Sequence, residues 1–251
     1  MPALQKTLAA VSVGAIATLG SAGAAFAAGT PATLAQIQAK AQAAVTARVD
    51  SMATAGQEIS AKKDLTAADA TTISNLFASD TSGLQALGAK IAADTTVTQA
   101  RADYKSIFTA YRVYVVAIPQ AHLAAADDVL VTGALPHLTD AQQRLQGLLA
   151  GADSAANTPA VQAAMTDLAT QLQTLSGANG LDTQVLAVTP AAWNADQQVM
   201  APFHQTVTSA WDAVRTARSD ISTVVSAIRS THGQSSTPGG APASPATGTN
   251  G

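Results

Sequence analysis

The chain contains no cysteine, so packing must hold it together without disulfide bonds. The same absence excludes thiol catalysis, a cysteine-ligated metal and a lipid-modified N-terminal cysteine. Glutamate is almost as scarce, because Glu58 is the only one in 251 residues. A single glutamate excludes the di-metal sites that some four-helix bundles build from several glutamates.

Aromatic and charged residues are also few, at 4% and 12% of the chain, and the formal net charge is only −3. This balance provides no basic surface for nucleic acid or for an anionic membrane. Much of the 47% apolar fraction is alanine, which has the best helix propensity but buries little area. The composition therefore predicts long helices that approach each other closely over narrow apolar seams.

The first 27 residues have the pattern of a secretory signal peptide. Lys6 gives a positive start, Leu8 to Leu19 form an apolar run, and Ala25-Phe26-Ala27 matches a cleavage site. The run is too short for a membrane anchor. We expect cleavage near Ala27 and a location outside the cytoplasm, either secreted or associated with the cell envelope. Loss of Lys6 would take the formal charge from −3 to −4.

Apolar residues recur every three or four positions along most of the remaining chain, as in amphipathic helices. Thr-Pro pairs that begin at residues 30, 158 and 189 and the Thr66/Asp69 pair are typical helix starts. Leu181 to Val188 is ambiguous. The predicted helices cover about 31–56, 66–93 and 97–118, a stripe from Leu123 to Leu148, a segment from Pro159 to Leu175 with coiled-coil-like spacing, and a last helix that ends near Ser230.

We therefore predict an all-α fold, an elongated antiparallel bundle of about four to five long helices over residues 28–232. Residues 233–251 are rich in Ser, Thr, Pro, Gly and Ala and contain no large apolar residue, so we expect a disordered tail. After the signal peptide no apolar stretch approaches the length of a membrane span, so no transmembrane segment is predicted in the mature chain.

Nearly every position from Ile107 to Ile118 is apolar. A helix that is apolar all round is normally enclosed by other helices, so we place this segment at the centre of the domain. The β-branched run Val113 to Ile118 could alternatively form a strand, but no second strand is predicted to pair with it. Pro119 must kink or end the helix, and the sequence leaves open whether the chain reverses there.

Two charges fall among apolar positions: Arg112 within that segment, and Asp127 on the stripe of Leu123 and Leu130. Neither charge can be buried alone without a large free-energy cost. If the chain reverses at Pro119, the two can meet as a buried pair. If the helix continues, they lie about 22 Å apart and need other partners. We favour a structural role, because the sequence offers neither a second ionisable group nor a pocket for acid–base work.

Tyr104, Phe108, Tyr111 and Tyr114 form a row at helical spacing. The row could be a stacking platform for a sugar or a lipid, but such rows more often belong to a core, with the tyrosine hydroxyls at its edge. We favour the core. Trp193 is the better candidate for an exposed aromatic contact.

Four histidines follow the predicted signal peptide: His122, His137, His204 and His232. His137 with Asp140, and His122 near Asp127 and Asp128, do not supply the three or four converging ligands that zinc needs. HExxH, P-loop, G-x-S-x-G and G-x-G-x-x-G motifs are all absent. We therefore predict no catalytic, metal or cofactor site.

The segment from Tyr111-Arg112-Val113-Tyr114 through Pro119-Gln120 to Asp127-Asp128 resembles one in uncharacterised secreted helical proteins of high-GC Gram-positive (actinobacterial) bacteria. The Thr189-Pro190 start near Trp193 and the Ala-Arg-Ser-Asp step over 217–220 fit the same resemblance. The resemblance implies export and an all-helical fold, and it supplies no activity.

These observations predict a non-enzymatic scaffold that binds an unknown protein or cell-envelope component, with no nucleic-acid partner. The alternative is a carrier of an apolar, lipid-like ligand, with the Tyr104 to Ile118 face lining a cavity between helices. An enzymatic hypothesis would rest only on His122, Asp127 and Arg112.

Overall fold

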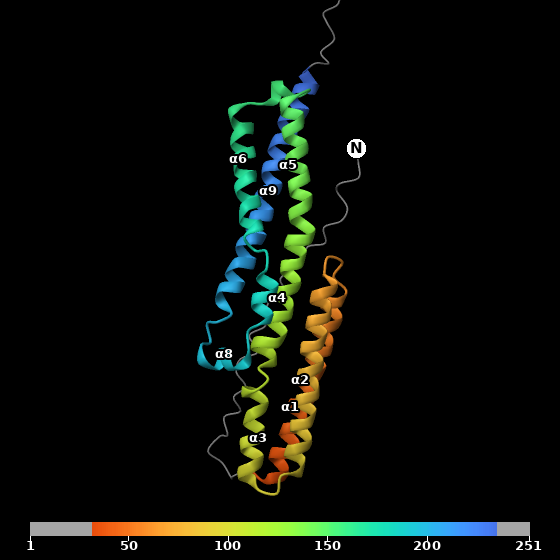
Figure 1. Ribbon diagram of the computed structural model, residues 1–251, viewed down its shortest axis with the longest axis vertical. Coiled ribbons are helices and arrows are strands. Elements are labelled where there is room, and N and C mark those ends of the chain that lie inside the picture. Colours follow the sequence, from red (N-terminus) through yellow and green to blue (C-terminus); the bar gives the residue numbers. More distant parts are fainter. Residues whose placement is uncertain (1–31, 235–251) are drawn as a thin grey trace, which may run out of the picture. The chain divides into compact units, whose positions relative to one another are not determined.

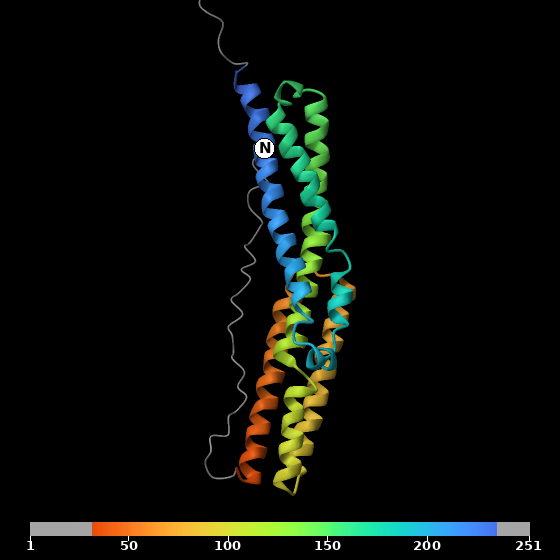
Figure 2. The ribbon, with the colours of Figure 1, turned by 90° about the vertical axis from the view of Figure 1, so that its left-hand side faces the viewer.

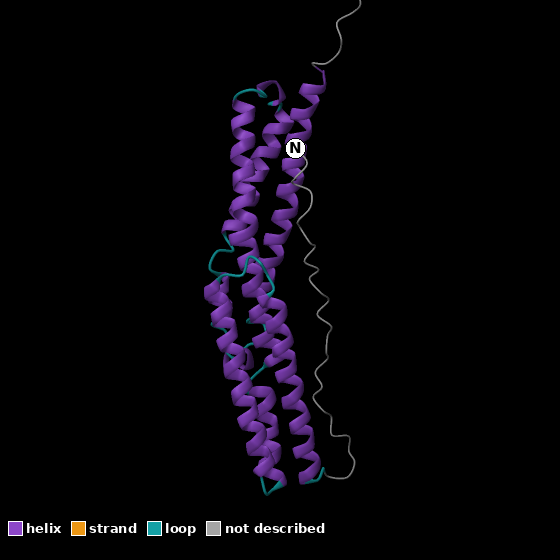
Figure 3. Cartoon of the chain, turned by 90° about the vertical axis from the view of Figure 1, so that its right-hand side faces the viewer, coloured by secondary structure: helices purple, strands orange, loops and turns teal. Residues whose placement is uncertain are grey.

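The computed structural model describes residues 32–234. The chain divides into two units, 1–33 and 34–251, and the helices belong to the second. The predicted signal peptide, the Thr30-Pro31 helix start and the tail from residue 235 onward lie outside the described residues. Within residues 32–234 every regular element is a helix (Figure 3), which confirms the all-α prediction.

Six of the helices have at least 13 residues, somewhat more than the four or five long helices predicted. The α-helices are α1 (Leu34–Ser60), α2 (Ala67–Ala93), α3 (Val97–Thr109), α4 (Ile118–Asp128), α5 (Leu135–Ala150), α6 (Pro159–Ser176), α7 (Leu181–Leu186), α8 (Pro190–Ala195) and α9 (Ala201–Gln234). Three short segments complete the list: the π-helical η1 (Val113–Ala117) and η2 (Val129–Ala134), and the 3₁₀-helical η3 (Ser154–Ala156).

The helical unit contains two groups of three helices, joined by α4. Helices α1, α2 and α3 pack against one another, and so do α5, α6 and α9 (Figures 1 and 2). Helix α4 contacts α1 and α2 of the first group and α9 of the second, and α7 packs against it. The polar side chains of α4 therefore lie where both groups meet.

Three of the predicted helix starts are confirmed. The side chains of Thr66, Thr158 and Thr189 each accept a hydrogen bond from a backbone N–H in the first turn of α2, α6 and α8. These contacts satisfy amides that have no partner within the helix. The ambiguous segment after Gly180 is also helical, as α7.

Each internal proline of the long run from η1 to α5 directly follows a π-helical turn. Ile118, before Pro119, donates its N–H to Val113 O, and Leu135, before Pro136, donates to Leu130 O. A proline lacks an N–H, and its ring clashes with the carbonyl four residues earlier in an α-helix. A wider turn relieves that clash. The chain therefore continues through Pro119 without reversing.

The break lies earlier, between Ala110 and Arg112, and this corrects the predicted helix over 97–118. Arg112 has φ 46°, the only non-glycine residue of the described chain in the left-handed region. The break turns the following residues, so Tyr114 and Val115 remain 39% and 37% exposed. The segment is therefore not enclosed all round as predicted, although Val113 is buried.

Helix α2 continues without interruption past Gly83. A Cβ at this position would lie 2.5 Å from Tyr111 Oη and 2.7 Å from Cε1 of the same ring. Only a glycine leaves room for the Tyr111 ring against α2. Gly83 is therefore a packing position between α2 and the break after α3.

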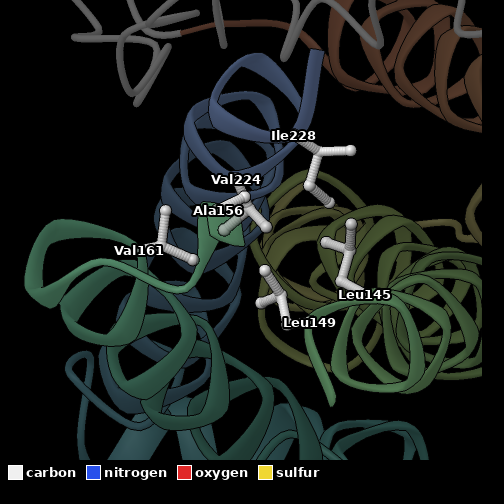
Figure 4. Close-up of a cluster of buried hydrophobic side chains, with 6 residues drawn as sticks. All are labelled: Leu145, Leu149, Ala156, Val161, Val224 and Ile228. Carbon is white, nitrogen blue, oxygen red and sulfur yellow. The ribbon is translucent and has the colours of Figure 1, made fainter. Parts of the chain in front are cut away.

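Helices α5, α6 and α9 enclose a core of aliphatic side chains (Figure 4). Leucines of α5 meet Val161 of α6 and Val224 and Ile228 of α9, and Ala156 of η3 closes the end. Nearby, His232 Nε2 lies 2.6 Å from Asp153 Oδ1, which ties the last described turn of α9 to the loop after α5.

One helical run of the described chain, Val97–Ala150, is long and apolar enough by composition to cross a membrane. Within its most apolar window, 56% is buried inside the unit. A core helix of a globular protein passes the same test, so the run is weak evidence for a membrane span.

Replacing a leucine of α5 by alanine should destabilise the protein more when the leucine is buried than when it is exposed. Leu145 is 6% exposed and Leu148 is 42% exposed, and both lie on α5. We expect Leu145→Ala to lower the free energy of unfolding by about 2–4 kcal/mol, and Leu148→Ala by less than about 1 kcal/mol. Urea denaturation followed by circular dichroism measures both, and equal losses would contradict this core.

Candidate functional site

Helix α4 carries buried polar side chains on the face that meets α7. Gln120 and Asp127 are 1% and 3% exposed and lie seven residues apart, which places them on one face of the helix. Gln120 Nε2 donates to Val185 O at 2.7 Å and to Val188 O at 2.6 Å. Asp127 Oδ2 accepts from the Asp182 N–H at 3.3 Å. Two side chains of α4 thus hold opposite ends of α7.

The neighbouring carboxylate, Asp128, holds the start of α2. Its Oδ2 accepts from the Thr66 N–H at 2.8 Å, while Thr66 Oγ1 accepts from the Asp69 N–H at 3.1 Å. In a capping box the third helical residue returns the bond to the N-cap amide. Here Asp128, from another helix, takes that place. The predicted Thr66/Asp69 pair is therefore half of a cap that α4 completes.

Asp69, Asp127, Asp128 and Asp182 together form a carboxylate cluster where α2, α4 and α7 meet. The first three side chains are buried, and Asp182 is half-buried. Asp69 Oδ2 and Asp127 Oδ1 are enclosed and have no hydrogen-bond partner. Two enclosed carboxylate oxygens without a partner carry a free-energy cost that protonation reduces.

Burial is the main cause of the raised pKa values in this cluster. It raises the pKa of Asp69 to about 7, and the nearby Asp128 and Asp182 raise it further through repulsion and hydrogen bonding. Burial likewise raises the pKa of Asp127 to about 6, against the hydrogen bond from the Asp182 backbone, which lowers it. Asp69 and Asp127 therefore retain protons that exposed carboxyls lose well below neutral pH.

Arg112 and Asp127, the two charges singled out in the sequence, do not meet. Arg112 Nε donates to Asn194 Oδ1 at 2.7 Å, and Asn194 Nδ2 donates to Thr109 O at 2.8 Å. This pair attaches α8 to the break after α3. Of the two alternatives drawn from the sequence, the one in which the chain does not reverse at Pro119 is observed, and Arg112 and Asp127 have separate partners.

The aromatic row is divided by the break after α3. Tyr104 and Phe108 contact each other edge to face, with ring centroids 5.1 Å apart. The guanidinium of Arg48 lies 4.4 Å from the Phe108 centroid and 5.0 Å from that of Tyr114. Tyr111 instead faces Gly83. The four rings are half-buried or exposed, so they do not form the predicted core row, and Phe108 and Tyr114 flank Arg48.

Neither histidine pair of the sequence forms a metal centre. His137 is exposed, and its neighbour Asp140 pairs with Arg144 at 2.8 Å. His122 does not face the carboxylate cluster: it lines a groove with Asp50 and Glu58 of α1. Within residues 32–234 no group of three or more histidines and carboxylates is arranged to hold a metal ion. Trp193 is half-buried in α8 rather than in a loop.

An open groove of about 470 Å³ lies along the α1–α2 hairpin. Its floor is apolar and its polar groups are uncharged. The lining residues are Val49, Met52, Ala53, Gly56, Gln57, Ile59, Ser60, Leu65, Ala70, Ile73, Ser74, Phe77, Ala78 and Thr81. A Cβ at Gly56 would lie 3.5 Å from the Phe77 ring, at ordinary van der Waals distance, so the ring packs close to α1 without requiring a glycine there.

No family model, curated protein or solved structure matches the chain. The resemblance to secreted actinobacterial helical proteins therefore stays a prediction.

The sequence alone assigned no role to Gln120, Asp182 or Asn194. Gln120 has a signal that could have found it, because it stands on the same stripe as Leu123, Asp127 and Leu130. A polar residue on an apolar stripe needs a buried partner. Asp182 and Asn194 carry no such signal, since they belong to short helices whose partners lie far away in sequence.

Removal of the Gln120 amide tests the attachment of α7. Gln120→Met keeps the length of the side chain but removes the donor to the two carbonyls at the end of α7. We expect a loss of about 1–2 kcal/mol in the free energy of unfolding. Gln143→Met, an exposed position on α5, should change stability by less than about 0.5 kcal/mol. If both variants unfold like the wild type in urea, α7 does not depend on Gln120.

Proposed function

We propose that the protein is exported and acts outside the cytoplasm as a non-enzymatic binding scaffold, secreted or attached to the cell envelope. The signal-peptide pattern over residues 1–27 supports export. The predicted domain over 28–232 and a disordered tail over 233–251 belong to the same proposal, and so does the coiled-coil-like packing of α6. The partner would be a protein or another component of the envelope.

One observation supports binding over catalysis: the α1–α2 groove and the titratable cluster are separate. An active site brings ionisable groups with shifted pKa values into a cleft that a substrate can enter. The lining of the groove contains no ionisable side chain. Leu65 and Ala70 of the lining flank Asp69 in sequence, yet Asp69 itself points into the cluster and bonds through its backbone to Thr66.

A second groove does contain ionisable groups, and it supports an enzyme poorly. It is lined by Asp50, Glu58 and His122, with Ser51 beside them. Both carboxylates are exposed. Burial lowers the pKa of His122, and so does Lys62. The Ser51 hydroxyl donates to Ala47 O at 2.7 Å, so it is not aligned with a base. Arg112 and Asp127, the other members of the enzymatic hypothesis, have their own distant partners.

The same groove along α1 and α2 favours a second candidate function, the carriage of an apolar ligand. Its volume of about 470 Å³ lies within the range of small-molecule sites, which are mainly apolar with a few polar groups. The predicted lining was the face from Tyr104 to Ile118. No residue of that face lines this groove, so the site for a ligand moves to the α1–α2 hairpin.

Export has a direct test. We expect the protein in the culture medium or the cell envelope of its native host, with an N-terminus near Ala28. Cell fractionation followed by N-terminal peptide sequencing measures both features. A cytosolic full-length protein that still begins at Met1 would overturn export and most of the proposed function.

Binding in the groove can be tested with N-phenyl-1-naphthylamine, an uncharged apolar probe whose fluorescence rises in an apolar site. Ala53 is exposed and lines the groove, whereas Ala86 is exposed on α2 outside it. Ala53→Trp fills the groove, so we expect at least about a tenfold rise in Kd, and no change for Ala86→Trp.

Two results would reject the carrier function. One is a wild-type protein that does not bind the probe, and the other is an Ala53→Trp variant that binds it as tightly as Ala86→Trp. Neither result touches the scaffold proposal, which depends on export and on a macromolecular partner.

A further inference from the structure

The attachment of α7 depends on buried carboxylates that face one another. Asp127 accepts from the first turn of α7, and Asp69 and Asp128 lie at the first turn of α2. The segment held there is short: α7 has six residues, and it buries Leu181 and Val185. A short helix with few buried side chains opens at low free-energy cost compared with the rest of a fold.

We propose that the carboxylate cluster of Asp69, Asp127, Asp128 and Asp182 is a proton-operated latch, which holds α7 against α4 while Asp69 and Asp127 carry protons and releases α7 when these two are ionised. The structure supplies the reason. Two enclosed oxygens, Asp69 Oδ2 and Asp127 Oδ1, have no donor. When ionised, they gain from hydration, and the opening of the short helix α7 gives water access to the cluster.

The charges around the cluster reinforce this effect. The negative charges of Asp128 and Asp182 raise the pKa of both Asp69 and Asp127. Among the described residues, α1 and α9, which also pack on α4, contribute no charge to either shift. Lys62, before α2, acts on His122 instead. Within residues 32–234, no cation therefore offsets the repulsion when Asp69 and Asp127 ionise.

The sign and range of the pH effect follow from the raised pKa values. A carboxyl with a folded pKa above its ordinary value stabilises the closed form fully below about pH 4, and this contribution is lost as pH rises through the folded pKa. The folded values are about 7 for Asp69 and about 6 for Asp127. The latch is therefore closed at pH 5 and weakened at pH 8.

Hydrogen exchange of the full chain, measured by mass spectrometry, tests the latch. Peptides that cover α7 are compared at pH 5 and pH 8 after correction for the intrinsic exchange rate. We expect their protection to fall at least about tenfold at pH 8, because each pH unit between 5 and 7 shifts the opening equilibrium by up to about tenfold. Peptides from the core between α6 and α9 should keep their protection.

Asp69→Asn removes the ionisable group while keeping the shape of the side chain. This variant should lose less protection of α7 at pH 8 than the wild type does, because only Asp127, with its pKa of about 6, still ionises with a raised pKa. Asp220→Asn serves as the matched control, because Asp220 also has an enclosed carboxylate oxygen without a partner but lies on α9. It should leave the pH dependence of α7 unchanged. If Asp69→Asn fails to fold, Asp182→Asn removes a charge that acts on both Asp69 and Asp127 and should reduce the pH dependence.

Two results would overturn the latch. The first is equal protection of α7 at pH 5 and pH 8 in the wild type. The second is a folded Asp69→Asn variant that loses protection at pH 8 as much as the wild type.

Discussion

The junction of the helical unit depends on two adjacent carboxylates of α4 that cap the first turns of two other helices. The first amides of a helix have no partner within it, and burial makes an unpaired amide costly. Asp127 and Asp128 accept from first-turn or N-cap amides of α7 and α2. Because successive residues on an α-helix point about 100° apart, two neighbours in sequence can serve helices packed on different sides.

The orientation of these carboxylates depends in turn on the interruptions around them. A π-helical turn adds a residue, so it rotates the following face relative to the preceding helix. The break at Arg112 and the turn of η1 both precede α4 and set the direction in which Gln120 and Asp127 point. The Arg112–Asn194 pair fixes the break from outside. The π-helical turn before Pro119 and the left-handed backbone at Arg112 thus position the polar face of α4.

Local features of the sequence predicted the helices well, but contacts between residues far apart in the sequence could not be predicted. The threonine caps depend on residues three positions apart, so Thr66, Thr158 and Thr189 could be read directly. The burial of Asp127 could also be read, because it interrupts an apolar stripe. Its partner could not, since Asp182 lies 55 residues away and belongs to a helix of one and a half turns.

The interruptions at Pro119 and Arg112 also depend on contacts that the sequence does not reveal. Pro119 was expected to kink or end a helix, but a π-helical turn accommodates it, and the break falls at Arg112, where no glycine or proline indicates one. The sequence of Tyr111 to Tyr114 gives no local reason for that break. Its reasons are tertiary: the Tyr111 ring fits over Gly83, and Arg112 bonds to Asn194.

The residues that carry the resemblance to secreted actinobacterial proteins are largely those that build the junction. Arg112, Gln120, Asp127 and Asp128 attach α8, α7 and the start of α2. None of them lines the α1–α2 groove. These residues fix the arrangement of the helices, whereas the proposed carriage of an apolar ligand depends on the groove of α1 and α2, to which they do not contribute. Evidence for the junction is therefore not evidence for a ligand.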